Sequence, residues 1–391
     1  MTKPILFVGS GISLPSFAKK GIGFATVQNL TEALFNRKWA QTTTNEWYED
    51  TGALPERSGQ PDCQEFLLRL RKHVEDYYFD LTGNPPTYED LYFLVQQIHD
   101  EVGWRDNAAV SDFRATVSRL SSDLCDARPS YGVRPFQVLA GETLNFIENA
   151  LSKLLAFTGE AVGLDIIKEL ASLSDDRPLV ICTLNHDLLI ENFLDKANIP
   201  YTDGFAKDHP DGIRHFAHSE LDRNDVRVKL LKLHGSINWW RFRPKGGKRD
   251  DDFLGIRVEP QHECRTKDGR LIDELDSGPS FLTGSDNKLK SYQAGVYLRQ
   301  MRHFESALET HSAILVSGYG WGDSGMSIRL RNWVYEESDR KIILLHENPK
   351  KLRAGRHLMH WMCPMVKQRK LILVRKWMCN ATTLELHSLF S

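Results

Sequence analysis

Ile5-Leu6-Phe7-Val8-Gly9-Ser10-Gly11-Ile12-Ser13 begins with a short apolar run that leads directly into a Gly-x-Gly turn. An uninterrupted apolar run of this length is typical of a strand buried on both faces, as in a parallel sheet covered by helices. Glycine lacks a Cβ, so the turn allows the backbone to approach a phosphate and point N–H groups at it. Position 14 is Leu14, so the full G-x-G-x-x-G pattern is absent, and an ordinary tight turn explains the two glycines equally well.

Five further apolar runs of the same kind follow along the chain. They are Leu179–Cys182, Leu230–Leu233, Ile314–Val316, Ile342–Leu345 and Leu371–Val374. Each is separated from the next by far more residues than a hairpin needs, which calls for crossover connections between parallel strands. The pattern predicts an α/β fold with a Rossmann-like parallel sheet.

The long stretch between the first and second runs has a different character. Its apolar residues recur at the spacing of amphipathic helices, in groups that begin at Phe66, Leu91, Phe113 and Ile147. We therefore expect residues 60–173 to form a large helical insertion subdomain, and residues 1–59 and 174–391 to form one domain around the sheet. Residues 243–287 are charged and irregular, with a turn at Lys267-Asp268-Gly269, and predict a solvated loop.

The composition is that of an ordinary globular protein. Of 391 residues, 41% are hydrophobic and 26% are charged, and 50 basic against 52 acidic residues leave a formal net charge of −2. This balance argues against a protein that mainly coats nucleic acid. The six cysteines form no C-x-x-C pair, which argues against a zinc module, and no apolar run approaches the ~18 residues that span a bilayer. We expect a cytoplasmic protein without a membrane segment.

Polar side chains follow several of the predicted strands. Asn185 and Asp187 come after the second run, and His234 comes after the third. The carboxyl ends of parallel strands meet at one edge of the sheet, where α/β proteins bind ligands. An amide can orient hydroxyls or a water, and histidine is well suited to proton transfer near neutral pH. The alternative for Asn185 or Asp187 is a cap of the helix that is predicted to follow.

Two later strand ends complete a recognisable order of motifs. Ser317-Gly318-Tyr319-Gly320-Trp321-Gly322-Asp323 follows the fourth run, and His346-Glu347-Asn348-Pro349 follows the fifth. With G-S-G-I-S, T-L-N-H-D and L-H-G-S before them, this order resembles the sirtuin fold. More closely, it resembles the bacterial sirtuin-like NAD-cleaving proteins of anti-phage defence. The paired zinc-binding cysteines of deacetylating sirtuins are absent, which favours cleavage of NAD itself over protein deacetylation.

The resemblance implies roles for individual residues. His234 would be the general base toward a ribose hydroxyl or an attacking water, Asn185 would orient both, and Asp187 would support the same edge. The residues implied to hold the pyrophosphate are Gly9, Ser10, Gly11 and Ser13. Gly318 and Asn348 would contact the adenosine half of the dinucleotide.

The function implied by the resemblance is that of an NAD+ hydrolase (NADase). It would release nicotinamide and ADP-ribose through an oxocarbenium-like transition state, with NAD as substrate and no metal required. Such an activity would poison its own cell, so we expect a gated effector that depletes NAD in antiviral defence. Hydrolysis and cyclisation pass through the same cation, so both products stay open. The resemblance also implies a homo-oligomer and a HerA-type hexameric ATPase as partner, with nucleic acid reached only indirectly through a partner.

Two other functions fit parts of the sequence. The same sheet edge would suit a sensor or binding module that holds NAD or an ADP-ribose-type ligand without cleaving it. A metal-dependent hydrolase or nuclease is the second alternative, and its candidate ligands are His209, Asp211, His215 and His218. Their spacing matches no standard metal motif, and a solvated loop explains them as well.

The C-terminal part of the chain carries an excess of positive charge. Residues 348–384 contain no Asp or Glu but many Lys and Arg, interleaved with Trp361 and Trp377. A docking face for an acidic partner or nucleic acid and an ordinary basic surface explain this pattern equally well.

Overall fold

The structure is a computed structural model of the chain. It describes residues 3–19, 26–41, 47–50, 62–100, 107–126, 135–156, 159–174, 176–259, 263–276, 278–283, 292–293, 295–354 and 358–390. None of the helices within these ranges is long and apolar enough to cross a bilayer.

The centre of the fold is a seven-stranded sheet with the order β13-β12-β11-β1-β4-β7-β5. Its strands are β1 (Ile5–Val8), β4 (Leu179–Thr183), β5 (Tyr201–Thr202), β7 (Val228–Lys232), β11 (Ala313–Ser317), β12 (Lys341–Leu345) and β13 (Leu371–Val374). All neighbouring pairs are parallel. The prediction of an α/β Rossmann-like parallel sheet is confirmed, and each of the six apolar runs forms one of its strands.

The strand order places a topological switch point between β1 and β11. From β1 the chain adds β4 and β7 on one side, then returns to add β11, β12 and β13 on the other. The connections that follow these two central strands therefore lead to opposite sides of the sheet. Open α/β sheets bind their ligands in the crevice that this reversal creates.

The alternation of side chains along β1 explains why its sequence is continuously apolar. Ile5 and Phe7 pack into the hydrophobic core on one face of the sheet, whereas Leu6 and Val8 pack into the core on the other. The first face is covered by α13 (Gly295–Thr310), α14 (Ser324–Glu336) and α15 (Leu358–Lys367). The second face is covered by α9 (Asp165–Ala171), α10 (Leu189–Lys196) and α16 (Thr383–Phe390).

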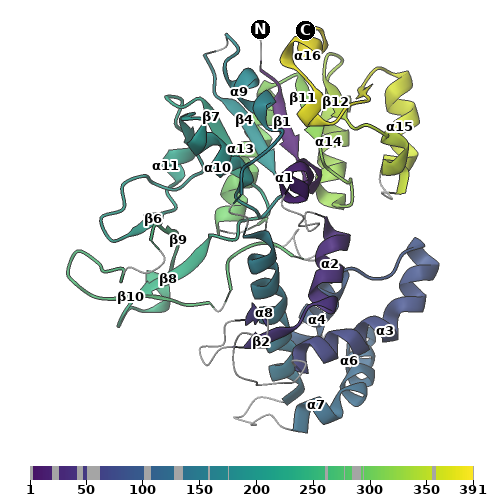
Figure 1. The fold of residues 1–391 in the computed structure, drawn as a ribbon, viewed down its shortest axis with the longest axis vertical. Coiled ribbons are helices and arrows are strands. Elements are labelled where there is room, and N and C mark those ends of the chain that lie inside the picture. Colours follow the sequence, from purple (N-terminus) through teal and green to yellow (C-terminus); the bar gives the residue numbers. More distant parts are fainter. Residues whose placement is uncertain are drawn as a thin grey trace.

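A separate helical layer lies at the other end of the molecule in Figure 1. It comprises α2 (Val27–Asn36), α3 (Asp62–Thr82), α4 (Tyr88–His99), α6 (Ala108–Leu120), α7 (Ser122–Asp126) and α8 (Pro135–Leu155), with a hairpin of β2 (Trp39–Gln41) and β3 (Trp47–Glu49). The rings of Trp39 and Trp47 pack edge-on against Phe146, with centroids 5.9 and 4.9 Å away. α2 packs in the hydrophobic core of the helical layer, whereas α9 packs in the core beside the central sheet. The boundaries of the helical insertion at residues 60 and 173 remain a prediction.

The region predicted as a solvated loop instead contributes to a second, antiparallel sheet with the order β10-β8-β9-β6. These strands are β6 (Ile213–His215), β8 (Trp240–Pro244), β9 (Phe253–Arg257) and β10 (Ile272–Glu274). On β8 the fully buried Phe242 lies between the exposed Arg241 and the half-buried Arg243, so the alternation of buried and exposed residues is short. The predicted turn at Lys267-Asp268-Gly269 is present, and Gly269 has a φ of 85°.

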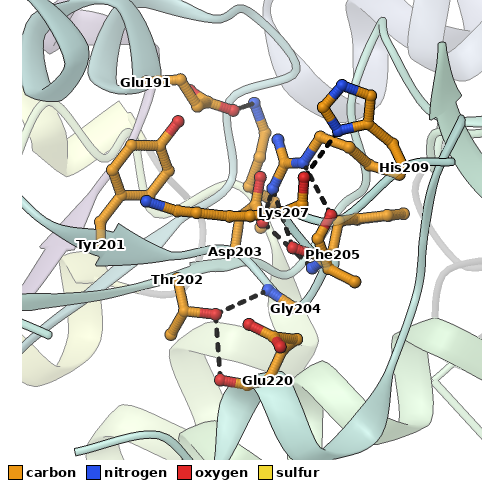
Figure 2. Close-up of polar contacts among 12 residues, drawn as sticks. Glu191, Tyr201, Thr202, Asp203, Gly204, Phe205, Lys207, His209 and Glu220 are labelled. Carbon is orange, nitrogen blue, oxygen red and sulfur yellow. Dashed lines mark hydrogen bonds and ion pairs between the residues drawn. The ribbon is translucent and has the colours of Figure 1, made fainter. Parts of the chain in front are cut away.

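A partly buried ion pair between Arg214 and Asp203 attaches this small sheet to the edge of the large one. Figure 2 shows Asp203 beside Phe205. Asp203, which follows β5, accepts hydrogen bonds on Oδ1 from Arg214 Nη2 at 2.7 Å and from Phe205 N at 3.0 Å. Gln300 Nε2 on α13 donates to the Asp203 carbonyl at 3.2 Å. The same residues therefore tie the edge strand, the small sheet and a covering helix together.

The remaining elements are short. They are η1 (Ser10–Ile12), α1 (Leu14–Lys19), α11 (His218–Leu221), η2 (Arg249–Asp251), η3 (Pro349–Ala354) and η4 (Met378–Asn380).

Candidate functional site

The loops that follow β1 and β11 cross in direct backbone contact at the switch point. Gly9 N donates to Ser317 O at 3.1 Å, and Gly11 N donates to Gly318 O at 2.9 Å. A Cβ on Gly9 would lie 2.7 Å from Gly318 O, and one on Gly11 would lie 2.7 Å from Gly318 Cα. Gly318 itself has a φ of 66°. The three glycines are therefore required for the close approach of the two loops, and the N–H groups of Gly9 and Gly11 are already hydrogen-bonded.

Asn185 follows β4 and faces the same crossing. Its Nδ2 donates to Ser13 Oγ at 3.1 Å and to Gly9 O at 3.3 Å, and the residue is only 7% exposed. These two bonds fix the plane of the amide. Among the described residues Asn185 Oδ1 has no hydrogen-bond partner, which leaves this oxygen to accept a bond from a hydroxyl or a water.

Asp187 extends the same network, but both of its carboxylate oxygens are occupied by the protein. Oδ2 accepts from Ser13 Oγ at 2.8 Å, and Oδ1 accepts from Leu189 N at 3.1 Å in the first turn of α10. The second bond reaches the first residue of α10, but the N-cap of this helix is Leu188, so Asp187 is not the predicted cap. Burial raises the pKa of Asp187, while the positive charge of Lys232 and the bond from Ser13 oppose the rise.

A buried lysine holds the loop after β4 in place. Lys232, at the end of β7 and 1% exposed, donates from Nζ to Asp187 O at 2.5 Å and to Glu191 Oε1 at 2.7 Å. Figure 2 shows the carboxylate of Glu191 turned toward this ammonium group. Burial raises the pKa of Glu191, and Lys232 opposes that rise. The sequence analysis did not single out Lys232. A lysine inside the apolar run Leu230–Leu233 nevertheless indicates a buried partner for its ammonium group.

His234 lies just beyond β7 and is 4% exposed. Its Nε2 lies 3.1 Å from Asp323 Oδ2, and its ring centroid is 6.1 Å from that of His186. The next residue, Gly235, has a φ of 81°, and a Cβ there would lie 2.6 Å from Ser280 O. Ser280, Phe281 and Tyr297 therefore occupy the space beside Gly235.

One cavity of about 240 Å³ brings most of the candidate residues together. Its lining includes the predicted residues Gly9, Ser10, Asn185, Asp187 and His234. Further residues of the T-L-N-H-D and S-G-Y-G-W-G-D motifs line it as well, namely His186, Tyr319, Gly320, Gly322 and Asp323. Residues far apart in the sequence thus converge beside the crossing of the two glycine loops.

The helical layer forms the remaining wall of this cavity. Val27, Leu30, Tyr88 and Leu155 provide apolar surface, and Glu89 provides a carboxylate from the first turn of α4. Sequence reasoning missed Glu89, because no local pattern shows that this helix faces the sheet edge. It also missed the contact of Asp323 with His234, although Asp323 stood in a quoted motif.

The other predicted residues lie around this cavity and not in its lining. Ser13 supports Asn185 and Asp187, and Gly318 packs against the glycine turn. Asn348 lines a separate cavity of about 850 Å³ at the ends of β12 and β13. Basic side chains surround that second cavity, namely Lys350, Lys351, Lys367 and Arg375.

The four candidate metal ligands do not gather. His215 Nε2 pairs with Asp211 Oδ2 at 2.6 Å, whereas the ring of His218 packs against His303 with centroids 5.4 Å apart. Within the ranges that the structure describes, no group of three or more His, Cys, Asp or Glu side chains is arranged to hold a metal ion.

Comparison with known proteins adds one family match. A family model described as a SIR2-like domain matches residues 179–362, a range that holds Asn185, His234 and Asp323 and leaves β1 outside. No curated protein matches the chain. The match supports a sirtuin-like family and, together with the seven-stranded parallel sheet, a sirtuin-like form of the α/β fold. A SIR2-like domain is compatible with an enzyme that uses NAD.

Proposed function

We propose that this chain, with a SIR2-like domain over residues 179–362, is an NAD+ hydrolase that releases nicotinamide and ADP-ribose. The observation that carries the proposal is the convergence of the buried residues Asn185 and His234 on one cavity beside the glycine-loop crossing. An amide acceptor and an imidazole are the two groups that water attack on a ribose carbon needs.

The proposed reaction breaks the bond between nicotinamide and the ribose C1′ and forms a bond between C1′ and a water oxygen. Nicotinamide leaves with the bonding electrons as a neutral heterocycle, and the ribose passes through an oxocarbenium-like cation. Asn185 Oδ1 orients the ribose hydroxyl or the water, and His234 takes the proton that the nucleophile loses. General-base help of this kind contributes about 10²–10⁴-fold in rate.

Negative charge in the cavity supports a cationic transition state. Glu89 and Asp323 both line it, beside apolar side chains of the helical layer. Carboxylates placed beside a developing cation lower the free energy of the transition state. Asp187 has both oxygens engaged, so its proposed part is to support Ser13 and the loop rather than to touch substrate.

The rest of the dinucleotide would extend along the switch point. We place the pyrophosphate near Ser10 and the glycine crossing, and the adenosine half toward Gly318 and Asn348. The cavity that Asn348 lines has a volume of about 850 Å³, which is ample for the adenosine half.

The biological role that we propose is a gated effector that depletes NAD in anti-phage defence, acting as a homo-oligomer with a HerA-type hexameric ATPase. The resemblance of the five ordered motifs to bacterial defence proteins supports it. The basic cluster after β12 is the proposed docking face. Changing Lys350, Lys351 and Arg353 together to Glu should dissociate the complex in a sizing experiment, and an unchanged elution volume would reject this face.

The activity is tested by incubating purified protein with NAD and resolving the products by chromatography, with and without the candidate ATPase. His234→Ala and Asn185→Ala should each abolish nicotinamide release while the far-ultraviolet circular dichroism stays unchanged. His209→Ala is the matched control, because it removes an exposed imidazole that lies outside the cavity. Wild-type turnover by His234→Ala would reject the assignment. Binding of intact NAD without nicotinamide release would favour the sensor.

A further inference from the structure

Asp323 contacts two different parts of the site at once. It is the N-cap of α14, where its Oδ1 accepts a hydrogen bond from Met326 N at 2.8 Å. Its Oδ2 lies 3.1 Å from Nε2 of His234, and the side chains of His234 and Asp323 are 5% and 9% exposed. The helix terminus fixes one oxygen of the carboxylate, which aims the other at the imidazole.

The loop that carries Asp323 is held in an unusual conformation. Trp321 has a φ of 59° and is 1% exposed, although a bulky side chain disfavours the left-handed region. Its ring packs on Tyr319 with centroids 5.2 Å apart, and its carbonyl accepts from Ser327 Oγ at 3.4 Å. The Tyr319 hydroxyl in turn donates to Asp323 O at 2.9 Å. Strained backbone persists where the surroundings over-determine it, and here they determine where Asp323 lies.

We infer that Asp323 is a positioning residue for His234: its carboxylate fixes the orientation of the ring and stabilises the imidazolium that forms when His234 takes a proton. The catalytic consequence rests on the proposed NAD hydrolysis, whereas the pairing itself does not. When His234 takes the proton of the nucleophile, the ring becomes an imidazolium beside the Asp323 carboxylate, an opposite charge that favours it.

The other groups that face the His234 ring carry less charge. The ring of Tyr292 lies 6.2 Å away, and burial, followed by the negative charge of Asp323, raises the pKa of its phenol, so it stays neutral. The ring of His186 lies 6.1 Å away and packs on Phe281 at 4.6 Å. Arg329 lies behind Tyr292, with its guanidinium 5.8 Å from the phenol ring. Asp323 is thus the charged group closest to the imidazole in this set.

The decisive variant is Asp323→Asn, because asparagine keeps an N-cap oxygen for Met326 N and removes only the charge. Asp323→Ser serves the same purpose if the first variant does not fold, since serine is also a good neutral N-cap. Thr26→Ala is the matched control: it removes the N-cap bond from Thr26 Oγ1 to Asn29 N on α2 and touches no charge near His234.

The first readout is the titration of His234 in ¹³C-labelled protein by NMR, which needs no turnover. Its midpoint should move to lower pH in Asp323→Asn and stay at the wild-type value in Thr26→Ala, since loss of an opposite charge disfavours the imidazolium. The second readout is the pH profile of NAD cleavage. In Asp323→Asn we expect kcat to fall by about 10²-fold with KM little changed.

An unchanged midpoint in both neutral variants would overturn the inference, as would a wild-type kcat and pH profile in Asp323→Asn. The same experiments test the proposed function independently of this inference. If wild-type protein cleaves no NAD but the titration still moves in Asp323→Asn, the pairing stands and the hydrolase assignment falls.

Discussion

Asn185 Nδ2 donates a hydrogen bond to Ser13 Oγ at 3.1 Å, which joins two residues that are 172 positions apart in the chain. Ser13 in turn donates to Asp187 Oδ2 at 2.8 Å. One small hydroxyl therefore connects the loop after β1 to the loop after β4, and the orientation of the catalytic amide proposed above depends on it.

Removing this hydroxyl should affect both stability and turnover. Ser13→Ala leaves Asp187 Oδ2 buried without its donor, which should lower the free energy of unfolding by about 1–3 kcal/mol. Urea denaturation measures this loss. Ser16→Ala is the matched control, because Ser16 is also buried and its Oγ accepts from Val162 N at 2.8 Å, whereas Ser13 Oγ bonds Asn185 and Asp187. Ser16→Ala should be less stable than the wild type but cleave NAD at the wild-type rate. If Ser13→Ala and Ser16→Ala cleave NAD at equal rates, the proposed role of Ser13 is wrong.

The buried Lys232–Glu191 pair makes a second prediction. Lys232→Met leaves the Glu191 carboxylate without its positive partner and should destabilise the protein by about 3–5 kcal/mol. Adding Glu191→Leu removes the stranded carboxylate and should recover most of the loss. Thermal unfolding of the two variants checks this, and a double variant no more stable than Lys232→Met would show that the pair is not coupled.

Glu148 on α8 should make stability depend on pH. Burial raises its pKa to about 7, although the hydrogen bond from Tyr92 at 2.6 Å opposes the rise. The folded carboxyl therefore binds its proton more tightly than the unfolded one. This contribution is present at low pH and is lost as pH rises from about 4.5 to 7.

Glu148→Gln removes that dependence. Its free energy of unfolding should exceed the wild-type value by roughly 1–3 kcal/mol more at pH 8 than at pH 4. Urea denaturation at the two pH values measures the difference, with Glu309→Gln on the exposed face of α13 as control. Parallel stability–pH curves for wild type and Glu148→Gln would contradict the prediction.

Glu89 tests whether the helical layer takes part in the proposed reaction. Glu89→Gln removes a negative charge from the cavity wall with little change of shape, so the transition-state cation loses stabilisation. We expect kcat for NAD cleavage to fall by about tenfold. Glu75→Gln on α3 is an exposed control that should retain full activity. If kcat of Glu89→Gln equals the wild-type value, the carboxylate of the helical layer takes no part in the reaction.

Much of the fold was predictable because its signals are local. Ile5–Val8 and the five later apolar runs are strands, since a strand buried on both faces must be apolar at every position. The edge strand β5 escaped prediction because Tyr201–Thr202 is too short to show a period. The strands around Phe253 and Ile272 escaped because charged residues that form ion pairs across the small sheet interrupt their alternation, as Arg243 does with Asp252 at 2.9 Å.

The candidate site was predictable only in part. Asn185 and His234 could be placed at one edge from the sequence, because the carboxyl ends of parallel strands coincide there. The amino-acid sequence by itself determined which segments form strands and helices and which polar groups stand at strand ends, since both depend on the order of apolar and polar residues along the chain. Only the tertiary structure decided that Asp323 faces His234 and that Glu89 closes the cavity. Those contacts depend on how a strained loop and a separate helical layer pack in space, which no local pattern of residues encodes.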